Sequence, residues 1–252
     1  KFMQKSNYGL ILLYILLIGA FILNIDPNGG AFKDFEYHSM VAKHFADDFY
    51  RTLYSYDRFA TRHSPVFYIF LSIFYKFEFN ENIIRLIIVH LGILLPLIFY
   101  KCLKFKYDRI NSQSLIYFSC IIILSPSFLS LTIWPDSRIF GLVFFCTSIF
   151  YFLKFKKKFK FKHSIKCIIF YSVSSYLSPN FSLFSIFYFY NFFIFYKFKK
   201  EIFLIIALNI LLSLPAIIYL FSLENIFLFR TAVPSDKISS EDFFNISNKI
   251  LI

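Results

Sequence analysis

The sequence predicts an all-α polytopic membrane protein, with about seven transmembrane helices and further helices lying along the membrane surface. Hydrophobic residues make up 58% of the 252 residues, and charged residues only 17%. A soluble domain carries about 25% charged residues, so this balance is unusual for one. Apolar stretches near the length of about 20 residues that crosses a bilayer core recur along the chain.

The predicted crossing helices begin close to the N-terminus and follow one another at short intervals. They cover the ranges Tyr8–Ile25, Ile83–Leu103, Leu115–Ile133, Arg138–Leu153, Ser164–Leu177, Phe181–Tyr196 and Ile202–Ser222. A further apolar segment, 66–77, has about twelve residues and is too short to cross a membrane. We expect this segment to form a helix in the interface.

The basic residues gather in short segments between the predicted crossings, and the formal net charge is +12. Lysine-rich loops are retained on the cytoplasmic side, which explains the charge better than binding to nucleic acid does. These segments hold Lys101, Lys104, Lys106 and Arg109, then the lysines of 154–166, then Lys197, Lys199 and Lys200. All of them fall on one side with the N-terminus if 66–77 does not cross. We therefore expect a multi-pass protein of a bacterial inner membrane with a cytoplasmic N-terminus.

This topology defines a transmembrane domain, 1–222, followed by an outer segment, 223–252. The transmembrane domain includes an outer loop, 26–82, with interfacial helices at 35–50 and 66–77. The outer segment has no domain of its own, and the first residue is Lys1. We expect the chain to be the N-terminal part of a longer protein.

The first interfacial helix is predicted from an apolar repeat. Tyr37, Val41, Phe45 and Phe49 recur at every fourth residue, which is typical of an amphipathic helix lying on a surface. Asp34 precedes this helix, where an N-cap residue belongs. A carboxylate at the membrane boundary is also suited to general base catalysis, so both roles stay open for Asp34.

A second carboxylate, Asp136, lies in the outer turn 134–137 and therefore on the same predicted side as Asp34. It too has the alternative role of an N-cap, for the helix that begins near Ser137. Two carboxylates from separate loops could position an acceptor or bind a divalent cation through their oxygens. The sequence contains no metal-binding motif, so we assign no metal site. A divalent cation bound by these two carboxylates is a possible cofactor.

Arg62 and His63 form a cationic pair directly before the short apolar segment. Arginine presents a planar fork of donors that suits a phosphate or pyrophosphate. Interfacial anchoring explains the pair equally well. Arg138, in the second outer turn, could join them or simply flank its helix.

Four segments, taken in order, resemble the outer loops of the GT-C glycosyltransferases. They are most similar to the branch that contains protein mannosyltransferases and the aminoarabinose transferase of lipid A. The segments are Asp34-x-x-Tyr37 with Ala42, Arg62-His63-Ser64-Pro65-Val66-Phe67-Tyr68, Asn80-Glu81-Asn82 with Arg85-Leu86, and Trp134-Pro135-Asp136-Ser137. The resemblance covers about Tyr8 to Leu153. The chain departs from the pattern at Ser64, where that group has proline, and after Asp34, where the usual Asp-Glu pair is missing.

The resemblance implies an inverting transfer of a sugar from a polyprenyl phosphate to a lipid, glycan or protein acceptor at the outer face. Asp34 would be the base and Asp136 would assist on the acceptor side. Tyr37, His38 and Arg138 would contact substrate, while Arg62 and His63 would approach the carrier phosphate. Membrane lipids are the only other partners implied.

Two other classes of function remain open on the sequence. A transporter or flippase for a lipid-linked sugar usually places ionisable groups inside its crossing helices. Here the charges lie at the predicted boundary, and the crossings hold little beyond His90 and Asn209. A non-catalytic membrane subunit is the third reading.

Overall fold

A computed structural model of the chain describes residues 2–26, 29–59 and 64–222, and the side chains of 8–26, 29–59 and 64–219 within them. Arg62, His63 and the predicted outer segment 223–252 lie outside the described residues. Within these ranges the chain is helical and contains no strand, as the sequence predicts. The helices are α1 (Phe2–Ile22), α2 (Gly30–Asp47), α3 (Phe49–Tyr54), η1 (Tyr56–Phe59), α4 (Val66–Lys76), α5 (Glu81–Gly92), α6 (Leu94–Lys106), α7 (Ser112–Cys120), η2 (Ile121–Leu124), α8 (Pro126–Ile133), α9 (Ser137–Lys158), α10 (Phe161–Leu177), η3 (Pro179–Phe184), α11 (Ser185–Tyr196) and α12 (Lys200–Ser222).

Short polar side chains set the beginnings of several helices. Asn80 accepts a hydrogen bond from the backbone N–H of Ile83 (2.9 Å) at the start of α5. Asn111 does the same for Gln113 (3.0 Å) at the start of α7. Each cap satisfies a backbone donor that has no partner inside its helix, so these residues fix where an apolar helix starts.

Three helices are long and apolar enough to cross a membrane. They are the joined pair α5 and α6 (Glu81–Lys106), α9, and α12 as far as Tyr219. Helices α7 and η2 (Ser112–Leu124) and helix α8 (Pro126–Ile133) are together long and apolar enough for a fourth crossing, but they meet at 72°. They count as a fourth crossing only if they form one broken span. The described chain therefore suits a membrane protein with three or four crossing helices.

The prediction of seven crossing helices is not supported. Two of the other predicted crossings are short as helices, since α10 has 17 residues and α11 has 12. Helix α1 is continuous over Phe2–Ile22, and its described side chains form an apolar helix over Tyr8–Ile22. Pro179 opens a short 3-10 helix before α11, because proline cannot continue a helix from the preceding turn. The apolar residues were read correctly, whereas the helix breaks between them were not.

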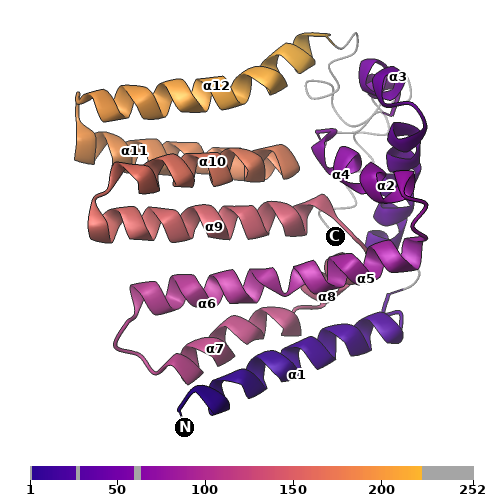
Figure 1. Cartoon of the computed structure of the whole chain (residues 1–252), viewed down its shortest axis with the longest axis horizontal. Helices are drawn as coiled ribbons and strands as arrows, with labels where there is room; N and C mark the ends of the chain where they lie inside the picture. Colours follow the sequence, from indigo (N-terminus) through magenta and orange to yellow (C-terminus); the bar gives the residue numbers. More distant parts are fainter. Residues whose placement is uncertain (1, 27–28, 60–63, 223–252) are drawn as a thin grey trace, which may run out of the picture.

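The long helices lie side by side, and the short helices α2, α3 and α4 gather at one end of them, on the right in Figure 1. We call this the Asp34 end. The turns with the clustered lysines lie at the opposite end, which we call the basic end (segments 101–109, 154–166 and 197–200). Contacts join these turns: Lys157 Nζ lies 3.1 Å from Asp108 Oδ2, and the Phe159 and Phe195 rings stack at 4.7 Å.

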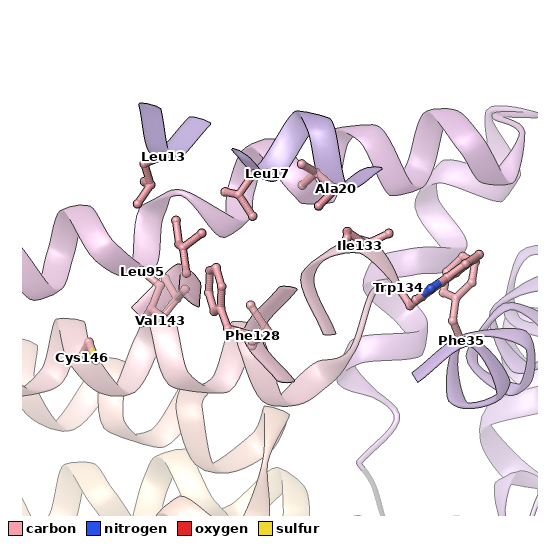
Figure 2. Packing of buried hydrophobic residues seen from close by; sticks show 13 residues of the cluster. Leu13, Leu17, Ala20, Phe35, Leu95, Phe128, Ile133, Trp134, Val143 and Cys146 are labelled. Carbon is pink, nitrogen blue, oxygen red and sulfur yellow. The ribbon is translucent and has the colours of Figure 1, made fainter. Parts of the chain in front are cut away.

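A hydrophobic cluster fixes α1 against the centre of the bundle. Figure 2 shows Leu13 and Leu17 of α1 near Leu95 of α6, Phe128 of α8 and Val143 of α9. These side chains are at most 9% exposed. Between helices in a membrane, close van der Waals packing of such side chains is what favours association. The cluster therefore holds together helices that are distant in the sequence.

Both segments that the sequence predicts as interfacial helices are helical, with shifted bounds. Helix α2 starts five residues before the predicted 35–50 and is followed by the separate helix α3, whereas α4 matches 66–77 closely. The apolar face of α2 does not lie open for a membrane surface: Ala42 belongs to one buried cluster with Phe67 and Leu71 of α4. Helix α2 is therefore a packed part of the bundle end, and its polar residues are held in place.

The separation of the two ends makes a direct prediction about topology. Phe79 lies after α4 near the Asp34 end and Lys160 lies at the basic end, and both are exposed. In a chain whose four native cysteines are replaced, Phe79→Cys and Lys160→Cys should react with a membrane-impermeant maleimide from opposite sides. Labelling of intact cells and of inverted vesicles measures this. Labelling of both positions from one side would contradict the two-ended arrangement.

Candidate functional site

Asp34 lies inside α2 and not at its beginning. The N-cap of α2 is Gly29, and the helical hydrogen bonds begin with Lys33 N–H donating to the carbonyl of Gly29 (3.3 Å). The prediction that Asp34 caps this helix is therefore wrong. Phe32 adds the extra turn, since its ring packs on the Trp134 ring at 4.7 Å. Capping consequently does not explain the carboxylate of Asp34, whose side chain is 53% exposed.

Asp136, by contrast, is the N-cap of α9. Its Oδ1 accepts a hydrogen bond from the backbone N–H of Arg138 at 2.7 Å, as the sequence predicts for one of its two roles. The residue is almost completely buried, at 2% exposure. An ionised carboxylate is buried at this depth only where charged or hydrogen-bonding partners compensate for the lost water.

Arg138 supplies that compensation and joins the two carboxylates. Its Nε and Nη2 donate to the two oxygens of Asp136, each at 2.8 Å, in the bidentate geometry that suits arginine. The same Nη2 donates to Asp34 Oδ2 at 2.9 Å. One guanidinium thus bridges α2 and the start of α9. The carboxylates that the sequence placed on one side do meet, through Arg138.

His38 lies behind this bridge. Its Nε2 is 3.7 Å from Asp136 Oδ2, and the residue is only 4% exposed. The imidazole contacts the rings of Phe67 and Tyr68 from α4, with centroids 5.4 and 5.3 Å away. This burial gives His38 the position of a residue that orients Asp136, one helical turn along α2 from Asp34.

The partners of Asp136 determine its ionisation. Burial by itself would raise the pKa of Asp136, but the neighbouring His38 imidazole and the hydrogen bonds and positive charge of Arg138 outweigh it and hold the pKa well below the ordinary range of aspartate. A group with a depressed folded pKa stabilises the fold above its unfolded pKa. The contribution of Asp136 is therefore complete at neutral pH and is lost only as the pH falls through that depressed value.

The remaining predicted site residues have different positions. Tyr37 is half-buried, and its hydroxyl donates to the carbonyl of Phe59, which ties α2 to the end of η1. Arg62 and His63 lie outside the described residues. Ser64, the residue after them, donates its hydroxyl to the carbonyl of Tyr176 at the end of α10. Ser64 thus ties the segment directly before α4 to the end of α10 at the Asp34 end.

Arg85 is a residue of this end to which the sequence reading gave no role. It is 7% exposed, and its guanidinium lies 3.5 Å from the centroid of the Trp134 ring. It donates to the Ile133 carbonyl (3.1 Å) and to Asn24 Oδ1 (2.9 Å). Arg85 therefore ties the end of α1 and helix α5 to the turn that carries Asp136. An arginine within a predicted crossing was the signal that could have found it.

The donor set does not favour a divalent cation between the carboxylates. The guanidinium of Arg138 occupies the position between Asp34 and Asp136 and carries a charge that a cation would face. Within the described ranges, no group of three or more His, Cys, Asp or Glu residues could hold a metal ion.

Comparison of the chain with protein-family models, with curated proteins and with solved structures finds no match. The class of molecule is therefore defined by the fold and the site alone. The described chain is all-helical and has helices long and apolar enough to cross a membrane. At one end of it, Arg138 forms ion pairs with both Asp34 and Asp136.

The charged bridge predicts the effect of one isosteric substitution. Asp136→Asn keeps an N-cap side chain for α9 but removes the negative charge beside Arg138 and His38. We expect the free energy of unfolding to fall by about 2 kcal/mol, since charge-assisted hydrogen bonds of a buried group are lost. Unfolding of the purified protein in mixed micelles measures the change.

The matched control is Asp108→Asn, which removes an aspartate at the exposed pair with Lys157. Exposed ion pairs contribute little to stability, so the control should unfold like the native protein. Equal stability of Asp136→Asn and the native protein would contradict the compensation described here.

Proposed function

We propose that the chain is the membrane domain of a glycosyltransferase that moves a sugar from a polyprenyl-phosphate donor to an acceptor. The observation that carries the proposal is the arrangement at the Asp34 end. A half-exposed carboxylate, Asp34, lies beside a buried one, Asp136, and a single arginine connects them. The resemblance of segments 34–42 and 134–137 to GT-C outer loops points to the same two carboxylates.

Asp34 has the exposure and the anchoring that a base needs. Among the described residues Arg138 bonds to Oδ2 of Asp34, which leaves Oδ1 for an acceptor hydroxyl. A base must lie within about 2.6–3.2 Å of the proton that it removes, so a carboxylate held at one oxygen has an advantage over a freely rotating one. Packing of α2 on α4 limits its movement further.

In the proposed reaction the acceptor oxygen attacks the anomeric carbon from the face opposite the carrier phosphate. The new C–O bond forms as the bond to the phosphate oxygen breaks, so the configuration inverts and the phosphate keeps the electron pair. Asp34 takes the proton of the acceptor hydroxyl. Asp136, with His38 behind it, orients Arg138 and through it Asp34. Arg62 and His63 belong to the proposal as groups that bind the carrier phosphate.

The charge distribution supports the proposed side of the membrane. Lysine-rich segments stay on the cytoplasmic side, and in the described chain they lie at the end opposite Asp34. The Asp34 end would then face outward from a bacterial inner membrane, with the N-terminus inside. A polyprenyl carrier that lies in the bilayer could reach this end from the side.

The main alternative is a transporter or flippase of a lipid-linked sugar. Such proteins place binding groups near the middle of the membrane. The buried ionisable groups of Arg85 and Asp136 instead lie beside Trp134 at the Asp34 end. His90 is exposed and bonds to Tyr14 of α1 at 2.5 Å. A non-catalytic membrane subunit remains the third candidate, and no observation favours it.

Substitution of Asp34 tests the proposal. Asp34→Asn keeps the shape of the side chain and removes its capacity to accept a proton, so transfer should fall by at least about a hundredfold. The assay follows release of polyprenyl phosphate from polyprenyl-phosphate glucose, mannose or aminoarabinose in reconstituted vesicles. Insertion and thermal stability should change little, because Asp34 is half-exposed.

Asp47→Asn is the matched control, since Asp47 is an exposed carboxylate at the other end of the same helix. It should retain full transfer. Turnover by Asp34→Asn at the native rate would remove Asp34 from the chemistry. Movement of the donor across vesicles without any transfer product would favour the transporter instead.

A further inference from the structure

The basic end carries far more positive charge than its neighbours neutralise. Its basic residues are Lys101, Lys104, Lys106, Arg109, Lys154, Lys156, Lys157, Lys158, Lys160, Lys162, Lys166, Lys197, Lys199 and Lys200. The same segments contain one acidic residue, Asp108, and Glu201 follows directly after the last of them. Retention on one side of a membrane explains the excess as a whole, but it does not explain how individual lysines are arranged.

Some of these lysines have partners within the protein. Lys157 Nζ pairs with Asp108 at 3.1 Å, and Lys156 Nζ donates to Asn191 Oδ1 at 3.3 Å. Both belong to the last turn of α9, where positive charge also suits the helix dipole. These contacts leave a second group of lysines without a described acidic partner.

This second group surrounds the ring of Tyr151. Lys154 Nζ lies 5.5 Å from the ring centroid and 4.2 Å from that of Phe150. Lys166, which comes from α10, lies 5.3 Å from the Tyr151 centroid. The Phe170 ring stacks on Tyr151 at 5.4 Å and 3°. Two ammonium groups from different helices thus each lie within about 6 Å of the centre of one aromatic ring.

Two more lysines reinforce the charge at this point. Lys101 of α6 and Lys158 of α9 lie close enough to Lys154 to repel its charge, as Lys166 does. We call Lys101, Lys154, Lys158 and Lys166 the Tyr151 cluster. Three helices contribute to it, so the bundle itself assembles the charge.

His163 lies beside the cluster, where the charges of several lysines act on its imidazole. The residue is 9% exposed, and its ring lies 6.3 Å from that of Tyr151. Burial lowers the pKa of His163, and the charges of Lys154, Lys162, Lys158 and Lys160 lower it further. Like charges held together in this way destabilise a fold unless an anion joins them.

We propose that the Tyr151 cluster is a binding site for the phosphate of an anionic phospholipid. Lys154 lies at the basic end of α9, one of the helices long enough to cross a membrane, so the cluster has the depth of a head group. The rings of Phe150 and Phe170 offer apolar surface beside the ammonium groups. Basic pockets between helices on the cytoplasmic side bind lipid phosphates in this way.

The site is separate from the carboxylates at the Asp34 end and does not depend on the glycosyltransferase proposal. A soluble inorganic phosphate would meet the same charges but would make no contact with the apolar surface next to them. The cluster therefore fits a ligand with a phosphate head and an apolar body.

Competition between lipids tests the assignment. The full chain, stripped of lipid in a neutral detergent, is exposed to equal amounts of phosphatidylglycerol and phosphatidylcholine, and retained lipid is counted by native mass spectrometry. The native chain should retain phosphatidylglycerol preferentially. Lys154→Gln with Lys166→Gln should reduce that preference about thirtyfold, because each of the two lysines near anionic lipid contributes on the order of 1 kcal/mol and about 1.4 kcal/mol is tenfold.

Two further variants separate the site from general charge. Lys199→Gln with Lys200→Gln removes the same charge from the same end outside the cluster and should keep the preference. Lys154→Arg with Lys166→Arg keeps the charge and should keep it too. Equal retention of the two lipids by the native chain would overturn the proposal. So would an equal loss in the Lys199 and Lys200 variant, or displacement of phosphatidylglycerol by millimolar inorganic phosphate.

Discussion

The bridge from Arg138 to two carboxylates is the interaction on which the Asp34 end depends. Asp136 is buried at the start of α9 and is stable as an anion only because Arg138 and His38 lie against it. Arg138 in turn has a spare donor direction, and Asp34 of α2 occupies it. A helix cap, a buried charge and the contact between distant helices are thus parts of one hydrogen-bonded unit. Loss of Arg138 would leave the buried Asp136 without its cationic partner, whereas loss of Asp34 leaves the pair of Arg138 with Asp136 in place.

Packing around the bridge gives it rigidity. Trp134 precedes Asp136 in the chain, and its ring lies between Phe32 of α2 and the guanidinium of Arg85 from α5. Its indole N–H donates to the carbonyl of Ile25 at 3.2 Å. One aromatic side chain therefore contacts residues from α2, from α5 and from the segment after α1. The half-exposed carboxylate of Asp34 is therefore held by Arg138 on a helix that is itself packed in place. A catalytic base needs such fixed positioning.

The two ends of the bundle were more predictable than its helices. The sequence predicted that the lysine segments share one side and that Asp34 and Asp136 share the other. This prediction needs only the order of polar and apolar segments along the chain. Helix bounds were less predictable, since Ser125 breaks the helix inside the apolar run 115–133 and a 3-10 helix takes up residues 179–184 before α11. The number of crossing helices was overestimated for this reason.

The bridge itself could not be read from the sequence. Arg138 and Asp34 are 104 residues apart, and their contact depends on tertiary packing that no local pattern encodes. The cap at Asp136 was predictable because capping acts within one helical turn. The same local rule failed for Asp34, where packing of Phe32 on Trp134 extends α2 beyond the expected start. Local chemistry therefore indicated the participants, and packing decided their roles.

A double-mutant cycle tests the bridge most directly. The free energies of unfolding of Asp34→Asn, Arg138→Gln and the double variant are compared with that of the native chain. We expect a coupling energy of about 0.5 kcal/mol or more between the two positions, which is in the range of half-exposed ion pairs. Asp47→Asn with Arg138→Gln should be additive. Additive effects of Asp34→Asn and Arg138→Gln would contradict the bridge and with it the arrangement of the site.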